Sequence, residues 1–300
     1  MTPRLATLFK GRLINCIDMA TKPTETAPSF LQVYTQVRRD RMKHSFLRQI
    51  NACVDWRGIR TLLNKKYTKT QNAVGNPAYD ALLMFKILLL ETWYGLSDYE
   101  VEERINDSLL FSEFLGLDLG YPSPDHSTIS RFRSELTRLG IMDKLLRELN
   151  KQFKKHGISR IDQGAIVDAS IVDSPYAPDT VALPALIEKS ELSSGVSVLA
   201  DKGYCSKKNS EYLAGHGLVD GIMLKAIRGK TLSESQKAFN RVISKTRCLI
   251  ERTFGSIRRW FLGGRCRYRG LERTHTQNIL EAMAYNLKRM PGLLVLQAAK

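Results

Sequence analysis

The sequence predicts a chain in two parts, an all-helical part over residues 30–160 and an α/β part over residues 161–295. Apolar residues recur at helical spacing in the first part, whereas short apolar segments of strand length alternate with helical patterns in the second. Strands that alternate with helices form a layered α/β domain. The 300 residues, 43% of them hydrophobic, are enough for two buried cores. Residues 1–29 match neither pattern, and we expect a disordered extension there.

Capping residues and glycines divide the first part into successive helices. Ser97 and Glu100 have the spacing of a capping box, and Gly95 and Gly116 are suited to end helices. The expected helical regions cover residues 30–70, 79–94, 97–106, 109–115, 126 onward and 141–156. The segment 79–94 is nearly all apolar, so that helix should be buried.

The second part reads as three buried strands with helices between and after them. The expected strands cover residues 163–172, 196–200 and 218–226. The expected helices cover residues 180–189, 207–214, 233–260 and 276–289, with a loop or short strand at 265–269. Pro291 should end the last helix, because proline cannot donate the next helical hydrogen bond.

The net charge of +16 and the pI near 9.7 indicate a nucleic acid as the macromolecular partner. The alternative is a basic but inert surface. Between residues 241 and 273 the acidic residues are Glu251 and Glu272 alone, against the basic residues Arg241, Lys245, Arg247, Arg252, Arg258, Arg259, Arg265, Arg267, Arg269 and Arg273. A solvated helix face normally mixes the two signs, so this run favours a functional basic surface.

Two classes of protein are disfavoured by the composition. The five cysteines form no CxxC pair and are odd in number, which argues against a disulfide scaffold or zinc module and favours a reducing cytoplasm. The longest apolar runs are too short for a transmembrane helix, so we expect no membrane partner.

The segment after the proline-rich turn at 121–125 predicts a helix with Ser127, Arg131 and Arg133 on its first turns. This polarity is expected of a helix that contacts DNA, which suggests these three residues as DNA-binding. An ordinary capped surface helix is the alternative.

Three carboxylates have the setting of a metal-dependent nuclease site. Asp168 and Asp201 each follow an apolar strand segment, and Glu251 lies in the long helical pattern. Carboxylates at strand ends and on a helix can converge on hard cations, the usual partners of phosphate chemistry. Arg247 and Arg258 lie about 40° and about 20° from Glu251 around a helix. A surface Arg–Glu pair would explain Arg247, but not the arginines that follow.

Several ordered motifs resemble those of the DDE-class transposases of bacterial insertion sequences, in the group named after insertion sequence five. In the second part the matching segments are Val167-Asp168-Ala169-Ser170, Leu199-Ala200-Asp201-Lys202-Gly203-Tyr204, Arg247-x3-Glu251-Arg252-Thr253-Phe254-Gly255-x2-Arg258-Arg259-Trp260, Arg267-Tyr268-Arg269-Gly270-Leu271 and Tyr285-Asn286-Leu287-Lys288-Arg289. In the first part they are Trp93-Tyr94-Gly95-Leu96-Ser97-Asp98 and Pro124-Asp125-His126-Ser127-Thr128-Ile129-Ser130-Arg131-Phe132-Arg133. The resemblance covers most of residues 30–295.

The resemblance implies a helical DNA-binding domain followed by an RNase H-like α/β domain. Asp168, Asp201 and Glu251 would be the catalytic residues and would hold two divalent cations, Mg²⁺ with Mn²⁺ as an alternative, for in-line phosphoryl transfer. The DNA-binding residues implied are Arg247, Arg258, Arg259, Lys202, Arg267 and Arg269, together with Ser127, Arg131 and Arg133 of the first part. The partners implied are double-stranded DNA, as terminal inverted repeats and target, and further copies of the chain, near the bacterial nucleoid. Related groups have a tyrosine where this sequence has Ser244.

The sequence departs from the resembled family between its two aspartates. Only 33 residues lead from Asp168 to Asp201, whereas the family places two further strands and a helix there, which would use nearly all of that span. We therefore expect that strands 2 and 3 of the family's 3-2-1-4-5 sheet are missing, with the join near residues 175–179. The Asp168 strand would then lie at an edge, which predicts reduced or absent transposition.

Two other functions fit the same sequence. A non-catalytic DNA-binding derivative would act as a regulator, with salt-sensitive binding and no metal-dependent cutting. A general RNase H-like nuclease would cut without specificity for element ends and without joining.

Overall fold

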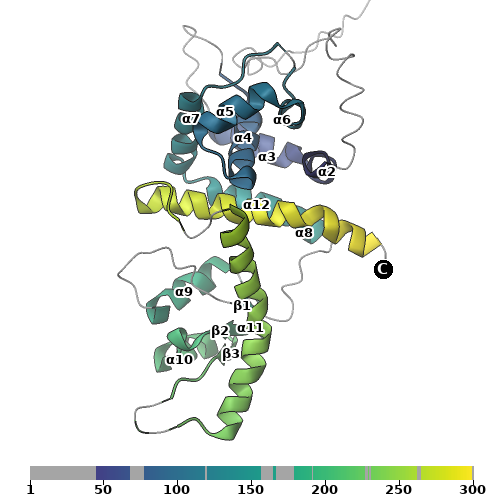
Figure 1. Ribbon diagram of the computed structural model, residues 1–300. Coiled ribbons are helices and arrows are strands. Elements are labelled where there is room, and N and C mark those ends of the chain that lie inside the picture. The colour runs from purple at the N-terminus through teal and green to yellow at the C-terminus, as the bar shows by residue number, and fades with distance from the viewer. Residues whose placement is uncertain are drawn as a thin grey trace, which may run out of the picture. The chain divides into compact units, whose positions relative to one another are not determined.

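The computed structural model describes residues 45–67, 78–118, 120–156, 165–166, 179–190, 192–226, 229, 231–261 and 265–298 (Figure 1). It divides into two compact units. The helical unit comprises Met1–Glu91 and Leu96–Ile141, and the α/β unit comprises Thr92–Gly95 and Met142–Lys300.

The helices of the helical unit follow the order expected from the sequence. They are α2 (Phe46–Cys53), α3 (Trp56–Lys66), α4 (Ala81–Tyr94), α5 (Asp98–Asp107), α6 (Leu109–Leu115) and α7 (His126–Arg138). The Ser97–Glu100 capping box is present, and Gly95 and Gly116 both have the positive φ of a helix end. These predictions are confirmed, and the parts of the expected region 30–70 that flank α2 and α3 lie outside the described residues.

Helix α4 is the buried centre of the helical unit. Its apolar side chains from Ala81 to Leu90 are at most 5% exposed, and each fully buried Leu, Ile or Phe contributes about 1.5–3 kcal/mol. Lys86 is the polar exception. Its Nζ donates to Asn51 Oδ1 at 3.0 Å and to the Phe114 carbonyl at 2.9 Å, and burial lowers the pKa of this amine to about 8. The buried helix is thus compatible with a lysine because its donors have partners.

The described elements of the α/β unit begin with a helix and end with two long ones. They are α8 (Met142–Lys155), β1 (Ala165–Ile166), α9 (Asp179–Ser190), β2 (Ser197–Ala200), the short 3₁₀ helix η2 (Lys202–Tyr204), α10 (Lys207–Gly215), β3 (Val219–Ile222), α11 (Glu234–Phe261) and α12 (Leu271–Ala298). Helix α8, which the sequence pattern groups with the first part, packs against α12 through the pairs His275–Asp143 and Asn286–Asn150. The domain limits at 29, 160 and 295 stay predictions.

The three described strands form a parallel sheet in the order β1-β2-β3, which confirms an α/β unit. Strands β2 and β3 are shorter than expected, and the rest of the first expected strand, residues 163–172, lies outside the described residues. Helices α9 and α10 lie on one side of the sheet and α11 runs along the other (Figure 1). On the α9 and α10 side the buried cluster consists of Leu183, Ile187, Val196, Val198, Ala200, Tyr204, Leu213, Leu218 and Ile222.

The expected limits of the last helix are wrong at both ends. The helix begins at Leu271, directly after Gly270 with its positive φ, and it continues through Pro291 to Ala298. Proline removes one helical hydrogen bond and strains the preceding turn, but a helix that is packed on another element can tolerate this. Here α12 packs on both α8 and α11.

None of the helices in the described residues combines the length and the apolar character needed to cross a membrane.

Candidate active site

Asp201 directly follows β2, at the carboxyl end of the central strand of the three described. Its Oδ1 accepts a hydrogen bond from the Gly203 N–H and so caps η2. Buried contacts hold the η2 turn in place. The Tyr204 side chain is 1% exposed, and the Tyr204 carbonyl accepts a hydrogen bond from Asn209 Nδ2 at 2.8 Å. The Asp201 side chain nevertheless stays 47% exposed. The carboxylate is therefore held in place while it faces solvent.

Asn240 sets the position of α11 relative to the sheet. Its Oδ1 accepts from the Leu224 N–H at 2.8 Å, and its Nδ2 donates to the Leu224 carbonyl at 3.0 Å. Leu224 lies just beyond β3, where the Met223 N–H still donates to the Ala200 carbonyl at 3.0 Å. The Asn240 side chain is 7% exposed, and it hydrogen-bonds both the N–H and the carbonyl of Leu224. These two bonds fix both the position of α11 along its axis and its rotation about that axis.

Arg247 lies two turns after Asn240, and the offset of seven residues puts the two on one face of α11. The arginine is 6% exposed, and its Nη1 lies 4.0 Å from Asp201 Oδ2 and 3.8 Å from Met223 Sδ. A buried guanidinium requires a partner of opposite charge. Its position beside Asp201 therefore makes Arg247 suited to orient that carboxylate, rather than to meet DNA directly.

Glu251 is exposed and lies one turn beyond Arg247 on α11. Asp168 lies outside the described residues. The strand before it pairs with the strand before Asp201 in the register Ile166–Leu199, and each aspartate stands two positions after its member of that pair in the sequence. Within the described part of the chain, no group of three or more His, Cys, Asp or Glu side chains is arranged to hold a metal ion.

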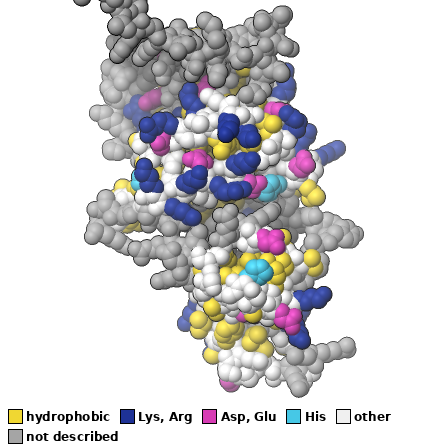
Figure 2. All heavy atoms as spheres, turned by 180° about the vertical axis from the view of Figure 1, so that it is seen from behind, with side chains coloured by type: hydrophobic (Ala, Val, Ile, Leu, Met, Phe, Trp, Pro, Cys, Tyr) yellow, Lys and Arg dark blue, Asp and Glu magenta, His cyan; other side chains and the backbone are white. Residues whose placement is uncertain are grey.

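Five of the basic residues expected to bind DNA are exposed in the α/β unit. They are Lys202 in η2, Arg258 and Arg259 in the last turn of α11, and Arg267 and Arg269 in the loop before α12. Figure 2 shows one face of the molecule, on which Lys and Arg side chains gather with acidic side chains scattered between them.

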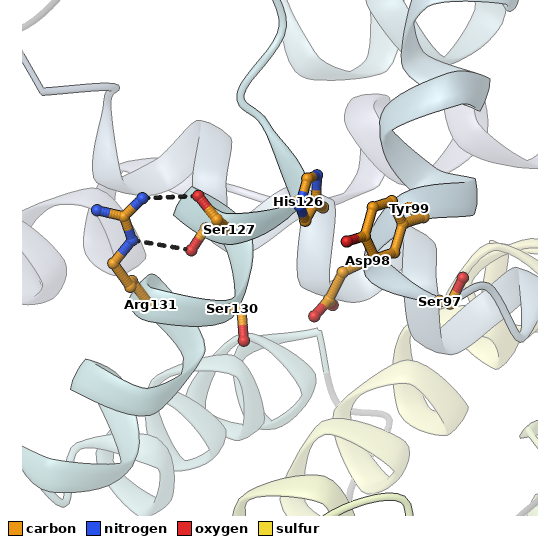
Figure 3. A pocket seen from close by; sticks show the side chains of 7 residues that line it. All are labelled: Ser97, Asp98, Tyr99, His126, Ser127, Ser130 and Arg131. Carbon is orange, nitrogen blue, oxygen red and sulfur yellow. Dashed lines mark hydrogen bonds between the residues drawn. The ribbon is translucent and has the colours of Figure 1, made fainter.

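An open pocket of about 520 Å³ lies between the first turns of α5 and α7 in the helical unit (Figure 3). Its lining residues are Ser97, Asp98, Tyr99, His126, Ser127, Ser130 and Arg131. The exposed Arg131 folds back on its own helix, where Nε donates to the Ser127 carbonyl at 3.1 Å and Nη2 to Ser127 Oγ at 2.6 Å. The His126 ring stacks on Tyr99 with 3.8 Å between ring centroids. Ser127 and Arg131 thus both lie at a surface that a partner can reach.

Arg133 differs from these two neighbours, because it points into the helical unit and is 5% exposed. Its Nη2 lies 2.6 Å from Glu91 Oε2, and its Nη1 lies 3.3 Å from Asp98 Oδ2. Burial raises the pKa of Glu91 to about 8, although the nearby Arg133 guanidinium lowers the pKa of this carboxyl. The expectation that Arg133 faces DNA does not agree with this position, since its guanidinium faces two carboxylates instead of solvent.

Sequence reasoning missed two of these polar residues. Asn240 belongs to none of the recognised motifs. Its spacing of seven residues from Arg247, which puts the two on one helix face, was the one feature of the sequence that could have indicated its role. Glu91 interrupts an almost entirely apolar segment, and such an interruption is the usual mark of a buried charge with a partner.

Comparison with known proteins agrees with the motifs. A family described as "Transposase domain (DUF772)" matches residues 35–135, and one described as "Transposase DDE domain" matches residues 147–287. A protein from Neisseria meningitidis serogroup B described as "Transposase for insertion sequence element IS1106" is 38% identical over 142 residues, which cover 47% of this chain and 48% of that protein. The chain thus matches about half the length of this curated relative, and no solved structure matches it. With a transposase domain in each half, in the order that the motifs follow, the chain belongs to the DDE transposases of bacterial insertion sequences.

Proposed function

We propose that the chain is a DNA transposase that binds the ends of an insertion sequence and catalyses metal-dependent DNA strand cleavage and strand transfer. The register between β1 and β2 is the single observation that carries this proposal. Ile166 pairs with Leu199 in a parallel ladder. A strand that continued this register for two more residues would have Asp168 beside Asp201, and this extrapolation supports the proposal.

The third carboxylate comes from α11. The Asn240 pair with Leu224 and the Arg247 pair with Asp201 hold this helix against the ends of β2 and β3. Glu251 follows Arg247 by one turn, and residues four apart on a helix are neighbours about 6 Å apart. The contact between Arg247 and Asp201 therefore supports a position for Glu251 close to the same strand ends.

The donor set suits two Mg²⁺ ions, or Mn²⁺, because all three side chains offer carboxylate oxygens. Asp201 fits this role in part, since its carboxylate is half exposed while one oxygen accepts from Gly203 and the other faces Arg247. Asp168, Asp201 and Glu251 would hold the ions. When bound, they supply activation of water or a DNA 3′-hydroxyl and stabilisation of the leaving oxygen.

DNA contact is proposed for residues that lie at the surface of each unit. In the helical unit Ser127 and Arg131 offer a hydroxyl and a guanidinium at the start of α7, groups that commonly contact phosphates. In the α/β unit the exposed cations are Lys202, Arg258, Arg259, Arg267 and Arg269. We assign Arg247 to Asp201 and leave Arg133 out of the DNA contact. Several copies of the chain on the bacterial chromosome would make up the working complex.

We further propose that an internal segment has been lost between the two aspartates and that activity is reduced or absent. Among the described strands β1 lies at an edge and β2 in the middle, the order that the loss of two family strands would leave. An edge strand has a neighbouring strand on one side only, which would favour reduced activity at the Asp168 position.

A non-catalytic DNA-binding derivative is the second candidate. The observation that favours it is the state of Asp201, both of whose oxygens are directed at groups of the chain itself. Such a protein would occupy element ends without cutting them.

A supercoiled-plasmid assay separates these functions. With Mg²⁺ and a plasmid that carries the element ends, a transposase nicks and joins DNA, whereas Asp168→Asn, Asp201→Asn and Glu251→Gln abolish cutting and keep DNA binding. Salt-sensitive binding with no cutting by the unaltered chain supports the derivative, and cutting without end specificity or joining supports a general nuclease. Joining as fast as by a relative with the longer spacing would overturn the proposed loss.

A further inference from the structure

The described loop residues 265–270, just before α12, are held by a side chain of α12. Gln277 Nε2 donates to the Arg265 carbonyl at 2.8 Å, and Gln277 Oε1 accepts from the Arg267 N–H at 2.9 Å. The Gln277 amide thus hydrogen-bonds the carbonyl of one loop residue and the N–H of the residue two positions later. A neighbouring β-strand makes the same pair of bonds.

The anchor of this loop is buried. Gln277 is 7% exposed, and its Nε2 also donates to Glu281 Oε1 at 2.8 Å, one turn further along α12. Glu281 is 6% exposed, and burial raises the pKa of its carboxyl, while Gln277 and Arg267 act in the opposite direction. Gln277 and Glu281, joined by their hydrogen bond, therefore lie on the buried face of α12.

The arginines of the loop are at the surface. Arg265, Arg267 and Arg269 are all exposed, as is Arg273 in the first turn of α12, and Glu272 is the acidic residue among them. Three cations at alternating positions, with a fourth in the first turn of α12 and one carboxylate beside it, make a surface of positive charge suited to a row of phosphates.

We propose that the loop 265–269 is a preformed clamp for the sugar–phosphate backbone of duplex DNA and that Gln277 is its positioning residue. The inference rests on the proposed function, since it takes DNA as the partner. A loop that is already held in one backbone conformation loses less conformational entropy when its arginines bind phosphates. Gln277 therefore strengthens DNA binding although its own side chain is too buried to reach the DNA.

The test measures binding of the full chain to a fluorescent 30-base-pair duplex without divalent cations, as a function of salt. Gln277→Met keeps the volume and the burial of the side chain but removes both bonds to the loop. We expect this variant to bind roughly three- to tenfold more weakly, with hydrogen exchange of the loop amides increased and that of the rest of α12 unchanged. The matched control is Gln236→Met, which removes an amide contact to the Ser233 N–H at the exposed start of α11 and should leave the affinity unchanged.

A double-mutant comparison distinguishes positioning from a general loss of structure. Arg267→Ala with Arg269→Ala should lower the slope of log affinity against log salt by about two. In the Gln277→Met background the same pair should cost clearly less affinity, because the clamp is already disordered. Equal binding by Gln277→Met and the unaltered chain, or fully additive losses, would overturn the inference.

The outcome is independent of cleavage. If plasmid cutting is absent but Gln277→Met weakens binding through the arginines, the clamp stands and only the catalytic proposal fails. If cutting occurs while Gln277→Met binds normally, the clamp alone is refuted. Should Gln277→Met lose the helical signal of α12, Gln277→Glu provides the second variant, because it retains the acceptor for the Arg267 N–H and should keep part of the affinity.

Discussion

Arg247 Nη1 lies 4.0 Å from Asp201 Oδ2, and the two side chains are unequally exposed, at 7% and 47%. The cation is inside the protein and the carboxylate is at its surface. This arrangement is the basis of our proposal that Arg247 positions the Asp201 carboxylate and does not contact DNA itself. It differs from a surface ion pair, in which both groups are solvated and contribute little.

Replacing Arg247 should separate positioning from DNA contact. We expect Arg247→Met to lower metal-dependent plasmid cleavage at least tenfold, because Asp201 loses the group that orients it, while the affinity for duplex DNA changes by less than twofold. The exposed Arg258 is the matched control. Arg258→Met should weaken DNA binding and reduce the salt slope by about one. Anisotropy titrations and nicking assays on both variants check this, and a large loss of DNA affinity in Arg247→Met would contradict it.

Gly221 should be intolerant of a side chain. It pairs with Leu199 in the ladder just before Asp201, and a Cβ at this position would lie 2.8 Å from the Val198 carbonyl oxygen. Gly221→Ala must shift β3 or β2 and should lower the free energy of unfolding by about 1–3 kcal/mol. Gly215→Ala meets nothing within 4 Å at the end of α10 and should be neutral or slightly stabilising. Urea denaturation of the two variants makes the comparison, and equal stability would show that the strands can separate without cost.

Substitutions of Arg131 and Arg133 should have different effects on stability and on DNA binding, although the two residues are only two positions apart on α7. Arg133→Met leaves the buried Glu91 and the partly exposed Asp98 carboxyl groups without their hydrogen-bond donor, so we expect the helical unit to lose about 1–3 kcal/mol. Arg131→Met removes an exposed guanidinium and should change stability by less than 0.5 kcal/mol while it weakens DNA binding. Thermal denaturation and anisotropy titrations test the pair. Weaker DNA binding by Arg133→Met, with its stability intact, would restore Arg133 to the DNA-contacting set.

Stability of the helical unit should fall between about pH 5 and pH 8 because of Glu91. Burial raises the pKa of this carboxyl from 4.5 to about 8 in the folded chain. The group therefore stabilises the fold fully below its unfolded pKa, and this contribution is lost as the pH rises through the folded pKa. Asp98 titrates outside this window, since its pKa is lowered. The Lys86 amine, with a pKa lowered to about 8, changes the pH dependence of stability only near and above pH 8.

The measurement compares the unaltered chain with Glu91→Gln, which cannot titrate at this position. Between pH 5.5 and pH 7.5 the difference in their free energies of unfolding should change by about 1–3 kcal/mol, in favour of the variant at the higher pH. All other titratable groups are the same in the two proteins, so the comparison isolates the effect of Glu91. A difference that does not depend on pH would show that Glu91 is ionised throughout.

Helix and strand positions followed from the sequence because their signals are local. The Ser97–Glu100 capping box, the glycines at 95 and 116, and the apolar runs that became β2 and β3 each act within a few residues. The path of α12 through Pro291 did not follow, since packing on α8 and α11 outweighs the local preference of proline.

The sequence by itself determined the family, the order of the elements and the residue types of the proposed site, because motif spacing and hydrophobic period are properties of the chain alone. Only the tertiary structure decided which arginines face solvent. Arg131 and Arg133, or Arg247 and Arg258, look alike in the sequence. One of each pair lies inside beside a carboxylate and the other outside. The physical reason is that burial of a charge depends on a partner contributed by another element, here Glu91 of α4 and Asp201 after β2, and such a partner is brought near only by folding.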